Sequence, residues 1–216
     1  MRPRARRSAA ALSCAPQQSR FTAALLLAWL AALGCIGTAQ AEPLSLHVQT
    51  ADGRPLRGAV IQVRSLDTPS RHASPEHAVM DQVDRAFAPD LLVIPVGSTI
   101  VFPNSDSVAH QIYSFSPAKR FQLPLYHGQP YPPTQFDQAG LVTLGCNIHD
   151  QMLAYVVVTD APYFGRTGPQ GLWSADVTPG RYRVAVWHPR LREVLRWIAR
   201  GRAVCDFENH SERSSS

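Results

Sequence analysis

The sequence predicts an all-β protein built as a β-sandwich, and three observations lead to this prediction. Apolar and polar residues alternate in the segment 44–50, as on a strand with one buried face. Turn signals such as Asp52-Gly53 separate runs of this kind along the chain. No long helical period occurs before Leu191. Short strands joined by Gly and Pro turns are typical of sandwiches.

Strands are expected at regular intervals after the first one. The expected segments are 44–50, 59–66, 91–94, 98–102, 110–115, 141–144, 153–159, 172–177 and 181–188. The last two flank Thr178-Pro179-Gly180 and predict an additional C-terminal hairpin. Residues 117–134 are rich in proline and are expected to form a connection outside any central sheet. An amphipathic helix is expected at 191–200, followed by a frayed tail.

The first 41 residues have the order of a secretory signal peptide. Five arginines precede the apolar run 21–30, and the small residues of Ala39-Gln40-Ala41 follow it. This run is shorter than the roughly 20 residues that cross a bilayer. We therefore expect cleavage before Glu42, a periplasmic or secreted protein, and no transmembrane span in the mature chain. A lipid anchor on Cys35 is a second, less favoured interpretation.

The formal net charge of +5 comes from this leader. The leader holds five of the 21 basic residues and none of the 16 acidic ones, so the mature chain is close to neutral. A neutral chain without a basic patch is not expected to bind nucleic acid. The arginines between 190 and 202 are interpreted as a solvated face before they are considered as a docking surface.

The segment that carries chemistry lies between two expected strands. It reads Gly145-Cys146-Asn147-Ile148-His149-Asp150-Gln151-Met152, and a short loop of this kind can aim a thiolate, an imidazole and a thioether at one point. His110 opens another expected strand and can complete the set. A thiolate, two imidazoles and a weak axial thioether are the ligands of a type 1 copper site.

These four residues resemble the copper ligands of the cupredoxins, the plastocyanin and amicyanin family of blue copper proteins. The chain order His110, Cys146, His149, Met152 matches the family's order, and the spacing of the last three resembles amicyanin-like members. The resemblance covers about residues 83–159 and implies a Greek-key sandwich that holds one copper ion. It also implies one-electron transfer with a redox partner protein and no enzymatic activity.

Three further segments resemble periplasmic cupredoxin-like proteins that are labelled methylamine utilisation proteins. They are 102–106, 113–117 and 145–150. The label implies an electron-transfer setting, and no residue here indicates methylamine chemistry. Family members often have Asn after the first ligand histidine, where this chain has Gln111, which puts the link between the two ligand loops in question.

The expected division of the chain follows from these assignments. Residues 42–160 are expected to form the copper domain, 161–190 an appended hairpin, and 191–216 a basic helix and a disordered tail. The segments 44–66 and 172–188 resemble strands of transthyretin-like or carboxypeptidase-regulatory-like modules.

Two other functions remain open on the sequence alone. A periplasmic copper chaperone or sensor would use the same four ligands without relaying electrons. A transthyretin-like interaction module without metal would leave Cys146 to pair with Cys205, since two cysteines in an oxidising compartment can form a disulfide. An enzyme is disfavoured because four ligands leave no coordination position open for a substrate.

Overall fold

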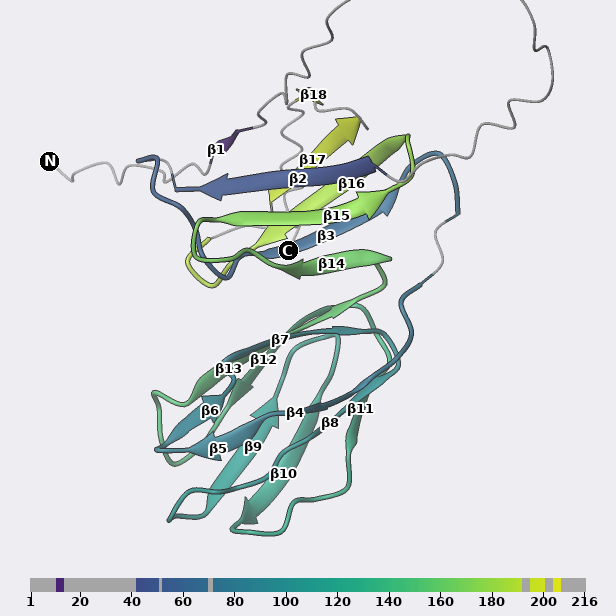
Figure 1. Ribbon diagram of the computed structural model, residues 1–216. Coiled ribbons are helices and arrows are strands. Elements are labelled where there is room, and N and C mark those ends of the chain that lie inside the picture. Colours follow the sequence, from purple (N-terminus) through teal and green to yellow (C-terminus); the bar gives the residue numbers. More distant parts are fainter. Residues whose placement is uncertain are drawn as a thin grey trace, which may run out of the picture.

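The strands of the protein gather into two bodies (Figure 1). The computed structural model describes residues 11–13, 42–50, 52–69, 72–191, 195–200 and 204–206, and these residues form strands and no helix. The lower body in Figure 1, here called the central module, contains β4 to β13. The upper body, here called the second module, contains β1 to β3 and β14 to β18. The prediction of an all-β sandwich protein is confirmed.

The central module consists of two facing sheets and a small hairpin. One sheet has the order β10-β9-β12-β13-β7, the other has the order β11-β8-β4, and β5 pairs with β6. The strands are β4 (His77–Val79), β5 (Asp81–Val83), β6 (Ala86–Ala88), β7 (Leu91–Pro95), β8 (Ser98–Val101), β9 (His110–Ser114), β10 (Phe121–Tyr126), β11 (Thr134–Phe136), β12 (Gly140–Gly145) and β13 (Leu153–Thr159).

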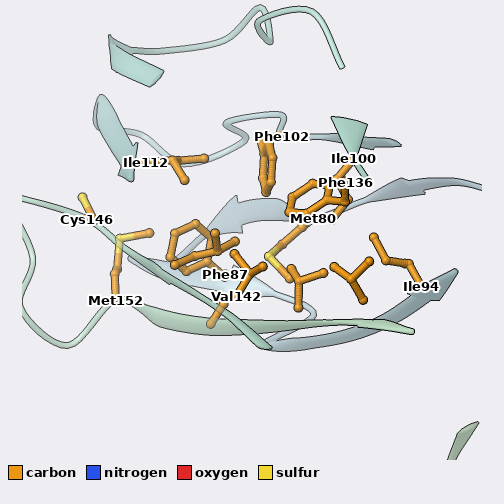
Figure 2. Packing of buried hydrophobic residues seen from close by; sticks show 14 of the residues in the cluster. Met80, Phe87, Ile94, Ile100, Phe102, Ile112, Phe136, Val142, Cys146 and Met152 are labelled. Atoms are coloured by element: carbon orange, nitrogen blue, oxygen red, sulfur yellow. The ribbon is translucent and has the colours of Figure 1, made fainter. Parts of the chain in front are cut away.

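The core of the central module forms because alternate side chains of each strand point inward. In β9 the side chains of His110, Ile112 and Ser114 are buried, while the two between them are partly exposed. Figure 2 shows the packed cluster, with Cys146 and Met152 at one end and Ile94 at the other. The candidate ligands therefore lie at one end of the apolar core.

The second module also consists of two sheets. Their orders are β1-β2-β15 and β14-β3-β16-β17-β18. The strands are β1 (Ala11–Ser13), β2 (Glu42–Gln49), β3 (Val60–Ser65), β14 (Tyr163–Arg166), β15 (Leu172–Val177), β16 (Arg181–Trp187), β17 (Leu195–Arg200) and β18 (Val204–Asp206). A separate core of apolar side chains from β2, β3 and β16 includes Leu46, Ile61 and Tyr182.

This pairing differs from the expected division at residue 160. β2 pairs with β15 and β3 pairs with β16, so strands that precede and follow the central module in sequence form one second module. The expected hairpin at 172–188 is not confirmed, since β15 and β16 belong to different sheets. β15 pairs with β2 and β16 pairs with β3, so β15 and β16 do not pair with each other.

The expected helix at 191–200 is wrong. Residues 195–200 form β17, which pairs antiparallel with β16 from Arg181↔Arg200 to Val186↔Leu195. The unpaired edge of β16 offers hydrogen-bond partners that outweigh a modest helical preference. The expected tail at 209–216 and most of the expected leader, residues 1–10 and 14–41, lie outside the described residues.

The two modules are joined by a small apolar contact and polar links. Val60 and Trp187 from the second module pack with Leu91 and Val157 from the central one, and all four are buried. An ion pair links Arg64 to Asp160 across the same boundary. Within the described parts of the chain, no helix is long and apolar enough to span a bilayer.

Candidate metal centre

The four residues singled out in the sequence come from neighbouring elements of one sheet. His110 is the first residue of β9, and Cys146 directly follows β12, which pairs with β9. His149 and Met152 lie in the loop that connects β12 to β13. The hydrogen bonds between β9 and β12 therefore set the separation of the first two candidate ligands.

Three of the four residues offer their ligand atoms to one point. One ligand atom of each of His110, Cys146 and His149 lies within 4.8 Å of the others. The Cys146 Sγ is 3.8 Å from the His110 Nδ1, and the two imidazole ring centroids are 5.0 Å apart at an angle of 60°. The structure thus brings together His110 and Cys146, which are 36 positions apart in the sequence.

Met152 lies beside this group at the end of the core. Its side chain is buried in the same cluster as that of Cys146, and Figure 2 shows both at the same end. The backbone N–H of Met152 donates to the carbonyl of His149 at 2.9 Å. This turn keeps the imidazole of His149 and the thioether of Met152 near Cys146.

Burial differs among the candidate ligands. His110 is completely buried, while Cys146 and Met152 are 3% and 2% exposed. His149 is only half-buried, but its Nδ1 is buried and has no hydrogen-bond partner in the described part of the chain. A buried imidazole nitrogen without a partner is costly, and a metal ion would satisfy it.

The donor set fits copper. Imidazole suits Cu(II), and thiolate and thioether sulfur suit Cu(I). Cys146 is a free cysteine, so its sulfur is available as a ligand. The side chains of His110, Cys146, His149 and Met152 would hold the ion, with the two sulfur donors on the core side.

Sequence reasoning missed Asp106, which contacts the first candidate ligand, His110. The Nε2 of His110 lies 2.9 Å from the Asp106 Oδ2. The hydrogen bond from His110, followed by the backbone N–H of Arg85, holds the pKa of the Asp106 carboxyl well below its usual range. The carboxyl is therefore ionised at neutral pH and accepts hydrogen bonds only.

The two ligand segments are tied together by amide side chains. Asn147 Nδ2 donates to Gln111 Oε1 at 2.8 Å, which joins the residue after Cys146 to the residue after His110. The sequence left this link in question because Gln111 replaces the Asn found in many cupredoxins. The longer Gln side chain reaches the loop and makes the link.

Comparisons with known proteins found no matching family model and no matching curated protein. Among solved structures, a purple cupredoxin from Nitrosopumilus maritimus is 26% identical, with a TM-score of 0.34, and the match covers 38% of this chain and 99% of that one. A mutant of amicyanin with Cu(I) is 21% identical, with a TM-score of 0.34, over 38% of this chain and 80% of its own.

A copper-containing nitrite reductase from Thermus scotoductus is 24% identical, with a TM-score of 0.37, and the match covers 44% of this chain and 25% of the enzyme. Two of these three proteins are named as cupredoxins or amicyanin, and one is named as an enzyme. Each of these three solved structures is matched over less than half of this chain.

Proposed function

We propose that this chain is an exported type 1 copper protein that carries single electrons. The observation that supports the proposal is the convergence of His110, Cys146 and His149, whose ligand atoms lie within 4.8 Å of one another. The unsatisfied Nδ1 of His149 supports it independently, because that atom has no hydrogen-bond partner among the residues that the structure describes. When bound, the copper ion would supply a Cu(I)/Cu(II) couple that accepts and releases one electron.

The four candidate ligands would have different roles in binding copper and in electron transfer. His110 and Cys146 are fixed by paired strands, so their separation changes little between redox states. Met152 would provide a weak thioether donor from the core. His149 is the least buried of the four and would form the electron exit toward solvent and a redox partner protein.

Electron transfer is favoured over enzymatic catalysis at this centre. With Met152 beside the three converging residues, four donors would surround the ion, and three of the four side chains are almost completely buried. A catalytic metal site keeps one coordination position open for substrate. We therefore propose a role without catalysis.

Voltammetry of the copper-loaded protein tests the electron-carrier role. We expect a reversible one-electron couple that keeps its shape at high scan rates, because the strands hold the ligands in place. A copper chaperone would instead hand its ion to a metal-free acceptor and show slow, irreversible voltammetry. That second result, with transfer of copper to the acceptor, would contradict the carrier role and support the chaperone.

Export is the second part of the proposal and rests on the order of charged, apolar and small residues in the first 41 positions. N-terminal sequencing of the native protein is expected to give Glu42 as the first residue. A mature protein that begins upstream of Ala41, or that is acylated on Cys35, would contradict this expectation.

A further inference from the structure

We propose that Asp106 is a positioning residue for His110 and that the β5–β6 hairpin holds Asp106 in place. The carboxylate would fix the tautomer of the His110 imidazole and would favour the oxidised state of the copper centre. This inference rests on the proposed function, and it concerns residues outside the ligand set.

The contact between Asp106 and His110 is buried and direct. The His110 Nε2 is 2.9 Å from the Asp106 Oδ2, and the two side chains are 0% and 8% exposed. A carboxylate can only accept, so the Nε2 carries the proton and donates it. In the neutral imidazole this leaves the lone pair on Nδ1, the atom that lies 3.8 Å from the Cys146 Sγ.

Backbone donors hold the carboxylate against the imidazole. The N–H of Arg85 donates to the same Oδ2 at 2.6 Å, and the N–H of Ser107 donates to Oδ1 at 2.7 Å. The Asn104 Oδ1 accepts the N–H of Asp106 at 3.1 Å. The two backbone donors to the carboxylate, together with the bond that fixes the Asp106 backbone, leave the Asp106 side chain little freedom to turn away from His110.

The donor from Arg85 depends on the shape of the β5–β6 hairpin. Asp84 and Arg85 form its two-residue turn with φ values of 51° and 58°, and Val83 pairs with Ala86 on either side. This is the geometry of a type I′ turn, in which both central residues have positive φ. The turn presents the Arg85 N–H to the Asp106 carboxylate.

Two further contacts anchor the hairpin to the segment that carries Asp106. The Asp81 carboxylate accepts the Oγ–H of Ser105 at 2.8 Å and its backbone N–H at 3.2 Å. Gln82 is completely buried and donates to the Pro103 carbonyl at 2.9 Å. The hairpin and the residues before His110 therefore form one hydrogen-bonded unit.

This arrangement has a consequence for the redox couple. A negative charge one imidazole ring away from the ion stabilises Cu(II) more than Cu(I), and a carboxylate partner increases the donor strength of the ligand nitrogen. The Asp106 carboxylate should therefore lower the reduction potential. Loss of such a partner typically weakens metal affinity by about 10-fold to 100-fold.

The first test uses the metal-free protein and does not depend on copper. Nitrogen NMR of the His110 ring is expected to show a neutral tautomer with the proton on Nε2 in the wild type and in Asp106→Asn, whose amide oxygen can still accept. In Asp106→Ala the ring should populate both tautomers. A wild-type ring that carries its proton on Nδ1 would overturn the proposal.

The second test is the reduction potential of the copper-loaded variants. Asp106→Asn removes the charge, so we expect the potential to rise because Cu(II) affinity falls more than Cu(I) affinity. If the affinity for Cu(II) falls tenfold more than the affinity for Cu(I), the reduction potential rises by about 59 mV. Asp106→Ala should raise the potential further, and Asp81→Ala, which releases Ser105, should raise it by a smaller amount.

Two matched controls separate this role from general effects of charge and fold. Asp150→Asn removes an exposed carboxylate from the ligand loop, and Arg85→Gly keeps the backbone N–H and suits the positive φ. Both are expected to keep the wild-type potential. A shift in Asp106→Asn no larger than in Asp150→Asn would overturn the inference, whereas a wild-type protein that binds no copper would overturn the proposed function instead.

Discussion

Single side chains determine the properties of the candidate centre. His110 is held by a strand and by Asp106, whereas His149 comes from a loop and keeps an unsatisfied nitrogen. Cys146 lies close to both histidines and is a free cysteine. The centre is therefore fixed on the side of the sheet and closer to solvent on the side of the loop.

Met152 provides a test of the weakest donor. We expect Met152→Leu to leave the fold intact, because Leu is close to Met in volume and such exchanges usually cost below about 1.5 kcal/mol. The reduction potential should rise, since loss of an electron-pair donor destabilises Cu(II) more than Cu(I). Met80→Leu changes a methionine elsewhere in the same core and should leave the potential unchanged. Equal potentials in both variants would remove Met152 from the ligand set.

Residue type and spacing were enough to find the four candidate ligands. Cys146, His149 and Met152 are close in sequence, and His110 begins a strand that the alternating pattern predicts. Asp106 could not be found in this way. Its role depends on backbone donors such as Arg85, which reaches it only through the folded hairpin.

At the scale of elements, strands with one buried face followed the sequence pattern well. β9 and β13 fall within the predicted segments 110–115 and 153–159, and β12 extends the predicted segment 141–144 by one residue at each end. β10 lies inside the proline-rich segment that was expected to stay outside a central sheet, and it is an edge strand whose pairing with β9 shifts between Leu123 and Tyr126. Pro124 is tolerated there because an edge strand can leave one side unpaired.

β17 and the joining of β2 and β3 to the C-terminal strands could not be predicted. That joining depends on pairing between residues far apart in sequence, as in Val63↔Val184, whereas β17 pairs with the preceding strand, as in Val184↔Trp197. Local periodicity carries no information about such partners. The same limit explains why the expected hairpin at 172–188 is not confirmed.

The start of β15 offers a stability test for the second module. Gly171 has a φ of +70°, and a Cβ there would lie 2.3 Å from the Val48 carbonyl oxygen. We expect Gly171→Ala to lower the free energy of unfolding by about 2 to 4 kcal/mol, from backbone strain and overpacking together. Chemical denaturation measures this loss.

Gly53 is the matched control for that variant. It has a φ of +81°, but no atom lies within 4 Å of the position of its Cβ. Gly53→Ala should therefore show the strain alone, about 1 to 2 kcal/mol. Equal losses in the two variants would contradict the close approach of Gly171 to β2.

At the scale of the whole molecule, the chain places a second sandwich next to the one that holds the candidate centre. The contact combines Val60 and Trp187 with Leu91 and Val157, and the Trp187 ring meets that of Tyr155 at 5.1 Å. The contact lies on the outer face of the sheet that carries His110 and Cys146. The second module therefore covers part of that face.

His188 follows Trp187 at this boundary and should make stability depend on pH. Burial, and then the neighbouring charge of Arg190, lower the pKa of His188 below its usual range; a hydrogen bond with the Arg57 backbone and the charge of Asp90 oppose this shift only in part. The folded protein therefore binds its proton less readily than the unfolded chain. Its contribution to stability is present above about pH 6.5 and is lost as the pH falls through the lower folded pKa.

Denaturation curves between pH 7.5 and pH 5, taken here as rough limits around the free imidazole pKa of about 6.5, check this prediction. The wild type should lose more unfolding free energy on acidification than His188→Asn, which cannot take up the proton. Parallel pH profiles for the two proteins would show that His188 is not shielded at the boundary.

The visible absorption spectrum of the purified protein with Cu(II) tests the central claim most directly. A thiolate bound to Cu(II) gives an intense visible band by charge transfer, so we expect this band in the wild type and in Cys205→Ser. Cys146→Ser should lack the band, and circular dichroism should show that its strands remain folded. Absence of the band from the wild type, or its persistence in Cys146→Ser, would contradict copper ligation by Cys146.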